Sequence, residues 1–366
     1  MQDWYSLFDK HDNILMLDAH MKADSVVNDP FNQNIICSIS GGSDSDVVLD
    51  IIHRVDRDHK VQYVWFDTGL EYEATKRHLN YLEDRYNIKI QRERAVKPIP
   101  LSCKEYGQPF ISKYASENLS RLQRHGFQWE DGPVEVLIEK YPDCKSSIKW
   151  WCNCKSSIPN STYNIDRNKY LKQFIIKNPP DFKISNLCCK YAKKDVAKKY
   201  YKDHDIDLDI TGIRKSEGGV RSISYKNCYS QNTEGVSHYR PIFWFTDDVK
   251  REYEQKFNIR HSECYTKYGF KRTGCSGCPY SRKLFDETAT MNLYEPKLYK
   301  AVSTVFKDSY EYTRKYREFQ KEMKLQEKMK KKEDSQVAID DMPDANPVRG
   351  CQSHQKIKGG LENEQK

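Results

Sequence analysis

Short apolar runs alternate with longer amphipathic segments along most of the chain. Helical spacing of apolar residues predicts helices over 13–27, 44–55, 73–86 and 190–203, and buried apolar runs predict strands over 34–40, 61–69, 88–94 and 207–214. Strands and helices that alternate at these lengths are typical of a doubly wound α/β fold with a mostly parallel sheet. We therefore expect this fold class, interrupted by a Pro- and aromatic-rich insertion after the third strand.

The C-terminal part has a different pattern. Residues 286–332 have the composition of helices, the last of them highly charged, and the segment from Glu333 onward has the composition of a disordered tail. The sequence thus predicts four parts, namely an N-terminal helical segment (1–30), an α/β domain (31–285), C-terminal helices (286–332) and the tail (333–366).

Composition and charge narrow the class of partner. The chain has a formal net charge of +8, which favours an anionic partner such as a nucleotide or a nucleic acid. No apolar run approaches the roughly 18 residues that a membrane span requires. The first residues carry acidic side chains where a signal peptide has a basic start. We expect a cytoplasmic protein that does not contact a membrane.

One loop between a predicted strand and helix has the chemistry of an anion site. Its residues, which include glycines and hydroxyl side chains, are Ser40, Gly41, Gly42, Ser43, Asp44 and Ser45. Free backbone N–H groups at a helix N-terminus bind phosphate, and ligands of open α/β sheets lie beyond the carboxyl ends of the strands. The glycines could equally serve only a tight turn, and Asp44 could cap the helix or contact Mg²⁺ or a ribose.

Twelve cysteines require an explanation in a chain expected in a reducing compartment. Clustered cysteines there more often bind metal or perform chemistry than form disulfides. The pair Cys188–Cys189 and the Cys-x-x-Cys of Cys275 and Cys278 are two of the close-set groups. The remaining candidates are Cys264, a competitor for one ligand position, and Cys152 with Cys154, either ordinary thiols or a redox pair.

The loop resembles the SGGxDS loop of PP-loop ATP pyrophosphatases, which holds the pyrophosphate of ATP. This chain has Ser43 where that loop often carries lysine. Further segments resemble the phosphoadenylyl sulfate (PAPS) reductase family in the order that family has them. They are FDTGLEYEAT, FKISNLCCKYAKKDVAKKY, DITGIRKSEGGVRS, RPIFWFTDDV and YGFKRTGCSGCPY.

The resemblance implies an adenine nucleotide α-hydrolase-like fold and a set of nucleotide contacts. Beside the loop, these contacts would come from Asp67, Thr68, Gly69, Gly212 and Arg214. It also implies that Cys188, Cys189, Cys275 and Cys278 hold one [4Fe–4S] cluster, which takes four thiolates. Structural Zn²⁺ on the same sulfurs is the alternative.

Basic residues within the matched motifs complete the expected site. Lys193 matches a lysine that links cluster and substrate in the reductases. Arg214 and Arg272 are candidates for a phosphate or sulfate contact, since a guanidinium can form two parallel hydrogen bonds with such a group.

Two branches of the family imply different reactions. Sulfonucleotide reductases use a cysteine nucleophile near the C-terminus, and here only Cys351, in Arg-Gly-Cys-Gln-Ser-His, keeps the Cys-x-x-His spacing. The ATP pyrophosphatases of bacterial DNA phosphorothioation instead use ATP with Mg²⁺ to adenylate an acceptor, with a sulfur donor protein and nucleic acid as partners. A third hypothesis is a nucleotide sensor or scaffold with a structural metal.

Overall fold

The computed structural model describes residues 4–218, 224–231 and 235–340. The chain divides into two compact units, Met1–Glu318 and Phe319–Lys366. The first unit holds the sheet and all of the helices but one. The exception, α16 (Lys307–Asp340), begins in the first unit and continues in the second.

A six-stranded sheet forms the centre of the first unit. Its strands are β1 (Ile35–Ser38), β2 (Gln62–Asp67), β3 (Ile90–Arg94), β4 (Leu208–Thr211), β5 (Tyr229–Ser230) and β6 (Ser237–Tyr239), in the order β3-β2-β1-β4-β6-β5. All neighbours pair in parallel except β5, which is antiparallel to β6. The chain moves outward from β1 to β3 and then returns to the other side of β1 at β4. The topological switch point therefore lies between β1 and β4.

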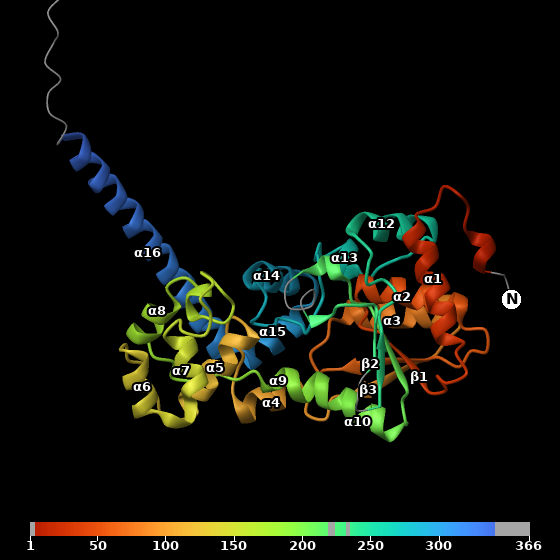
Figure 1. Ribbon diagram of the computed structural model, residues 1–366, viewed down its shortest axis with the longest axis horizontal. Helices are drawn as coiled ribbons and strands as arrows, with labels where there is room; N and C mark the ends of the chain where they lie inside the picture. Colours follow the sequence, from red (N-terminus) through yellow and green to blue (C-terminus); the bar gives the residue numbers. More distant parts are fainter. Residues whose placement is uncertain (1–3, 219–223, 232–234, 341–366) are drawn as a thin grey trace, which may run out of the picture. The chain divides into compact units, whose positions relative to one another are not determined.

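Helices cover the two faces of the sheet unequally (Figure 1). On one face, α1 (Ile14–Val27), α2 (Ser43–Val55), α3 (Glu73–Tyr86) and α12 (Asp247–Lys256) pack on buried residues such as Cys37 and Ile210. On the other, α10 (Asp195–Asp203) packs Tyr200 against Ile36 and Val64. The second face is covered by a much smaller apolar cluster.

A second apolar core contains several of the cysteines. The helices that contribute to it are α4 (Ile99–Tyr106), α9 (Leu187–Cys189), α13 (Glu263–Thr266), α14 (Leu284–Tyr294), α15 (Pro296–Val305) and the start of α16. The other helices are α5 (Lys113–Arg124), α6 (Val134–Lys140), α7 (Lys145–Trp151) and α8 (Leu171–Lys177). Helices α5 to α8 form the insertion between the third and fourth strands, where Trp150 and Trp151 are almost fully buried.

The fold class expected from the sequence, a doubly wound α/β fold with a mostly parallel sheet and a helical C-terminal extension, is confirmed. Two local predictions need correction. Residues Lys190–Lys194, expected as regular helix, form a π-helix between α9 and α10. Residues 333–340, expected as the start of a disordered tail, continue α16, because neither proline nor glycine interrupts that stretch. Within the described residues, no helix is both long and apolar enough to cross a membrane.

Candidate functional site

The glycine-serine loop lies where β1 ends and α2 begins, at the switch point of the sheet. The Ser45 hydroxyl donates to the Gly42 carbonyl (2.7 Å) and lies 3.2 Å from the Ser40 hydroxyl. Gly42, the N-cap of α2, has no side chain that could accept from the first N–H groups of the helix. The N–H groups of Ser45 and Asp46 donate to the Gly42 carbonyl (2.9 and 3.2 Å), so an anion here would meet the positive end of the helix dipole and the N–H groups that precede Ser45.

Two glycines let other segments approach this loop. Gly41 has φ +67°, and a Cβ there would lie 2.6 Å from Cγ2 of Thr75. Gly212, which follows β4, faces the start of α2, and a Cβ there would lie 2.9 Å from the Asp44 carbonyl carbon and 3.0 Å from the Ser45 nitrogen. Larger side chains at either position would displace the loop.

Charged side chains converge on the first turn of α2. Arg214 Nε donates to Asp44 Oδ1 (3.0 Å), and Arg214 Nη1 donates to Asp247 (2.7 Å). Lys250, from α12, donates to the Ser43 hydroxyl (2.8 Å) and lies 3.3 Å from Asp44. Burial raises the pKa of Asp44, although the two cations act in the opposite direction. Two cations thus lie beside the loop, and the lysine comes from a distant helix.

A buried network lies below the loop and holds α2 in place. Asp46, which is fully buried, accepts hydrogen bonds from His78 (3.0 Å) and His261 (2.8 Å). Burial alone would raise the pKa of Asp46, but the hydrogen bonds from His261 and His78 lower it. Although burial opposes its charge, hydrogen bonds to Asp46 and Glu254 raise the pKa of His261 to about 9. His261 is therefore a cation at neutral pH.

The turn after β2, the strand that pairs with β1, contacts the Cys-x-x-Cys segment. Within it, the Gly69 N–H donates to Asp67 Oδ1 (2.8 Å), and the Thr68 hydroxyl donates to Glu71 (2.6 Å). The Thr68 hydroxyl is also within hydrogen-bonding reach of the Cys275 thiol, and the backbone N–H of Ser276 donates to the Leu70 carbonyl (3.0 Å). The segment expected to contact the nucleotide therefore also supports the Cys-x-x-Cys loop.

The four cysteines expected as ligands lie close together, although the two pairs are far apart in sequence. Hydrogen bonding with Cys103 raises the pKa of Cys188, and hydrogen bonding with Cys188 raises that of Cys189. Burial, followed by the charge of Cys275, raises the pKa of Cys278 to about 12. Burial also raises the pKa of the Cys275 thiol, with a smaller contribution from Cys189.

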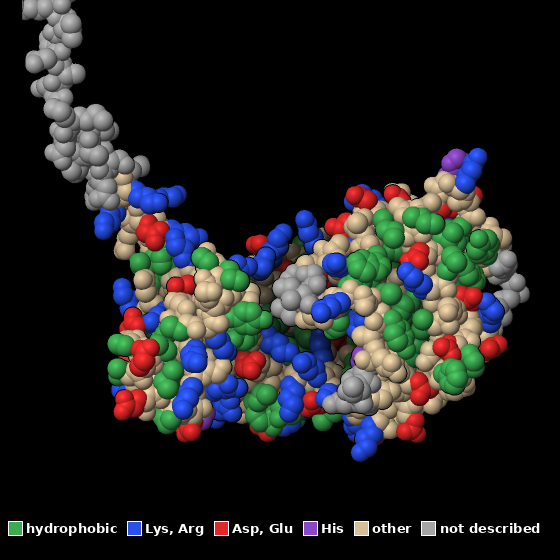
Figure 2. All heavy atoms as spheres, viewed as in Figure 1, with side chains coloured by type: hydrophobic (Ala, Val, Ile, Leu, Met, Phe, Trp, Pro, Cys, Tyr) green, Lys and Arg blue, Asp and Glu red, His purple; other side chains and the backbone are tan. Residues whose placement is uncertain are grey.

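A lysine stands beside these thiols. Lys193 lies in the π-helix that directly follows the Cys–Cys pair, a form of helix that recurs at functional sites. The charge of Cys275 raises the pKa of Lys193, and the charge of Glu71 acts in the same direction. A lysine ammonium next to thiolates stabilises their negative charge. Figure 2 shows Lys and Arg side chains gathered around a hollow in the surface, which would attract anionic ligands.

The four thiols supply the donor atoms of both metals expected from the sequence. A single Zn²⁺ takes four sulfurs at Zn–S distances of about 2.3 Å. In a [4Fe–4S] cluster each thiolate binds a different iron. Among the described residues, no three His, Cys, Asp or Glu side chains converge so as to hold a single metal ion.

Residues that follow the Cys-x-x-Cys loop in sequence, in α15 and α16, pack against it. Gly277 has φ +63°, and a Cβ there would lie 2.4 Å from the Tyr310 hydroxyl and 2.9 Å from Val302. The buried Tyr310, in α16, donates to the Gly277 carbonyl. The loop therefore needs both the glycine at 277 and the first turn of α16 to keep its course.

Other residues singled out in the sequence have partners of their own or lie outside the described residues. Cys264 contacts Thr75 (3.8 Å), and Cys154 contacts the Cys152 carbonyl (3.1 Å) in the insertion. Arg272 donates to Glu217 (2.9 Å). Cys351 lies beyond the residues that the structure describes.

Sequence reasoning missed several residues that the fold brings to the site. Cys103 adds a fifth thiol next to Cys188. Lys250 reaches the loop from α12. A Cβ on Gly42 would lie 3.2 Å from the Tyr265 hydroxyl, which is itself 2.9 Å from the Thr273 hydroxyl. None of these residues has a local sequence signal, because each meets the site only through long-range packing.

Comparison with solved structures shows several distant likenesses. A phosphoadenylyl-sulfate (PAPS) reductase from Candida auris is 14% identical over 70% of this chain and 87% of that chain, with a TM-score of 0.40. An NH3-dependent NAD synthetase from Campylobacter jejuni is 12% identical over 82% and 95%, with a TM-score of 0.35. The U34-tRNA thiolase NcsA from Methanococcus maripaludis, solved with its [4Fe–4S] cluster, is 12% identical over 83% and 79%, with a TM-score of 0.33.

No curated protein matches the chain in sequence. The phosphoadenosine phosphosulfate reductase domain, however, matches residues 34–124 and 154–281. The match spans β1 to the Cys-x-x-Cys loop and leaves out only part of the insertion, so that it covers more than half of the chain. The chain therefore belongs to the phosphoadenosine phosphosulfate reductase domain family.

Proposed function

We propose that this protein is an ATP pyrophosphatase of its family, which adenylates an acceptor so that sulfur can be transferred to it. The observation that carries the proposal is that the two candidate sites follow neighbouring strands, β1 and β2. The anion-binding loop, with Lys250 beside Ser43, follows β1, and the turn after β2 brings Thr68 within hydrogen-bonding reach of Cys275, one of the four neighbouring thiols. A nucleotide held by the loop and this turn would lie next to the cysteines.

The loop supplies what the first step of such a reaction requires. An acceptor oxygen would attack the α-phosphorus of ATP, and the bond from that phosphorus to the bridging oxygen of the β-phosphate would break, releasing pyrophosphate. The N–H groups at the start of α2, Lys250 and Arg214 would stabilise the negative charge that develops on the departing phosphates. Asp44 and Asp67 are the carboxylates available to Mg²⁺.

The cysteines would hold a [4Fe–4S] cluster, with one thiolate each from Cys188, Cys189, Cys275 and Cys278. When bound, such a cluster supplies a centre that can carry sulfur or exchange an electron. Lys193 would stabilise the thiolates and orient an anionic group between the two sites. A sulfur nucleophile would then displace AMP from the adenylated acceptor, forming the carbon–sulfur or phosphorus–sulfur bond as the bond to AMP breaks. Nucleic acids and sulfur-carrying proteins are the partners to test as acceptor and donor.

Anaerobic calorimetry tests this proposal. Purified protein is titrated with ATP and Mg²⁺, with adenylyl sulfate, and with phosphoadenylyl sulfate. Preferential binding of ATP, with release of pyrophosphate in the presence of an acceptor, is expected. Binding of ATP without any product under all acceptors tried would instead support a nucleotide sensor with a structural metal.

The family match also favours a second candidate, a sulfonucleotide reductase with Cys351 as nucleophile. In that reaction the thiolate attacks the sulfur of the sulfonucleotide, and the bond from sulfur to the phosphate oxygen breaks. Truncation after Asp340 keeps the whole of α16 and removes Cys351. Preference for a sulfonucleotide together with loss of turnover on truncation would establish the reductase. Unchanged turnover would exclude Cys351.

A further inference from the structure

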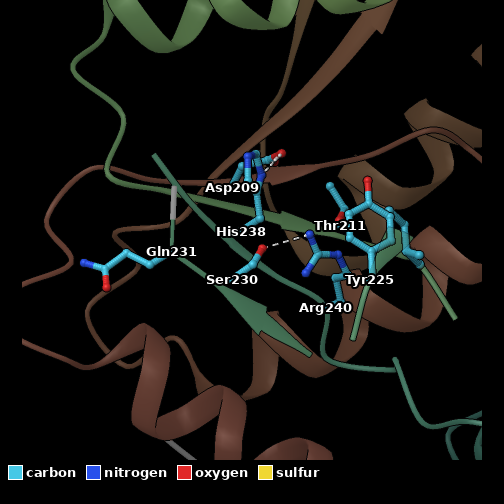
Figure 3. A pocket seen from close by; sticks show the side chains of 8 residues that line it. Asp209, Thr211, Tyr225, Ser230, Gln231, His238 and Arg240 are labelled. Atoms are coloured by element: carbon cyan, nitrogen blue, oxygen red, sulfur yellow. Dashed lines mark hydrogen bonds and ion pairs between the residues drawn. The ribbon is translucent and has the colours of Figure 1, made fainter. Parts of the chain in front are cut away.

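A second polar cavity lies on the thinly covered face of the sheet, away from the loop and the cysteines. Its volume is about 340 Å³, and residues of β4, β5 and β6 and of the segments beside them line it. Figure 3 shows Arg240 at its centre, with Ser230 approaching the guanidinium from one side and Tyr225 from the other. A cavity of this size is large enough for a small organic molecule.

Arg240 is unusual among the buried arginines of the chain. Its side chain follows β6 and is only 2% exposed, and its Nε and Nη1 atoms have no hydrogen-bond partner. Nη2 donates to the Ser230 hydroxyl (3.1 Å), and the Tyr225 ring centroid lies 3.9 Å from Cζ. Neither contact supplies a negative charge. A buried guanidinium with unpaired donors destabilises the folded state unless an anion accompanies it.

Comparison with two other arginines shows what is missing at Arg240. Arg54 and Arg214 each donate to a carboxylate at hydrogen-bond distance, and their pKa values are raised despite burial. The pKa of Arg240 is lowered by burial, although Tyr225 and the charge of Asp209 act in the opposite direction. Among the described residues, no carboxylate forms a hydrogen bond with Arg240, and its guanidinium keeps donors for a further anionic acceptor.

The other ionisable groups of the cavity restrict the kind of anion. Asp209 already accepts from the Ser38 hydroxyl (2.6 Å) and the Tyr201 hydroxyl (2.8 Å), and His238 Nδ1 lies 3.4 Å from it. The carboxylate of Asp209 remains in the cavity wall, so a doubly charged anion would be repelled more strongly than a singly charged one. A planar carboxylate also matches the planar guanidinium.

We propose that this cavity binds a small molecule through its carboxylate, which pairs with Arg240. The carboxylate accepts from Arg240 in place of the Ser230 hydroxyl, and the Thr211 hydroxyl at the end of β4 provides a further donor. Thr211 is followed by Gly212, which abuts the anion-binding loop, so the two sites share one strand. The assignment goes beyond the proposed function and does not depend on it.

The first test needs no ligand. Because Arg240 lacks an anionic partner, Arg240→Met is expected to leave the unfolding temperature unchanged or higher in buffer without carboxylates. Arg54→Met is the matched comparison, since Arg54 forms two hydrogen bonds with Asp50 (2.7 and 3.1 Å), and it is expected to lower that temperature. A drop for Arg240→Met as large as that for Arg54→Met would assign Arg240 a structural role and overturn the proposal.

The second test measures binding of acetate, succinate, benzoate and inorganic sulfate by saturation-transfer NMR and calorimetry. At least one carboxylate is expected to bind the wild-type protein and to bind Arg240→Met at least tenfold more weakly, with Thr211→Val in between. ATP is titrated into the same samples, so that failure of the nucleotide loop is seen separately. Carboxylates that bind neither protein, or both equally, would contradict the proposal, as would binding of sulfate alone at Arg240.

Discussion

The ammonium of Lys250 lies 2.8 Å from the hydroxyl of Ser43, although 207 residues separate them in sequence. PP-loops often carry lysine at the position of Ser43. Here α12, which packs on the same face of the sheet as α2, brings the cation, and Asp44 and Glu254 (2.9 Å) fix its position. A serine in the loop is therefore compatible with a positive charge at the same place.

This relationship predicts a rescue. Lys250→Met should weaken ATP binding by roughly tenfold to a hundredfold, because a charge-assisted contact contributes about 1.5–3 kcal/mol. Adding Ser43→Lys to Lys250→Met should restore most of that affinity. Calorimetric titration with ATP measures both effects. Arg251→Gln, an exposed neighbour on α12, serves as the control, and absence of rescue would show that Lys250 acts only through Asp44 and Glu254.

The cysteine site predicts which thiols retain iron. Serine at Cys188, Cys189, Cys275 or Cys278 should each abolish binding of four irons and four sulfides after anaerobic reconstitution. Serine at Cys264 should leave the iron content unchanged, since that thiol contacts Thr75 instead. Iron and sulfide analysis with the visible spectrum gives the result. Full iron content in any of the four variants would remove that residue from the ligand set.

The hydrogen bond from Tyr310 to Gly277 predicts a selective effect on cluster retention. Tyr310→Phe should destabilise the protein by about 1 kcal/mol and hasten cluster loss to a chelator, because it leaves the Gly277 carbonyl unpaired. Tyr312→Phe removes a similar bond, to the Asn178 carbonyl (2.6 Å), and should destabilise without changing cluster loss. Equal rates of loss in the two variants would show that α16 does not hold the cysteine loop.

The raised pKa of His261 predicts that the free energy of unfolding falls with pH. The native pKa of about 9 lies above the ordinary value of 6.5, so the folded state binds the proton more tightly than the unfolded state. The resulting stabilisation is complete below pH 6.5 and is lost as pH rises through 9. It amounts to roughly 3 kcal/mol. Urea unfolding of wild type and His261→Gln between pH 6 and 9.5 checks this, and a constant difference between them would contradict it.

Local sequence signals were sufficient for strands β1 to β4 and for the helices that follow β1 and β2, but they did not reveal the short strands β5 and β6. Segment 73–86 has the bounds predicted for it, and β1 and β2 lie within their predicted runs, because apolar periodicity and turn residues act over a few positions. The insertion gave no such signal. Helices α6 to α8 have seven residues each and depend on tertiary packing, for example on Trp150 and Trp151.

The candidate site also combines residues that a local sequence motif reveals with residues that only the folded structure brings together. The loop at Ser40–Ser45 and the two cysteine pairs could be found from the sequence, because each is a short motif of reactive residue types. Cys103 and Lys250 could not be found, because each is brought to the site by helices packed in three dimensions. The π-helix around Lys193 was missed for a related reason, since its sequence is also compatible with regular helix.

The hydrogen bond between Tyr310 and Gly277 also bears on how the protein is made. During synthesis the Cys-x-x-Cys loop leaves the ribosome before the helix that holds it, so for a time all four thiols are present while the loop that carries two of them, Cys275 and Cys278, is unanchored. A metal that binds the nascent chain in this interval binds cysteines whose positions are not yet fixed. The loop takes its final course only after the start of α16 has emerged, and correct metal insertion would therefore be favoured late in translation or after release.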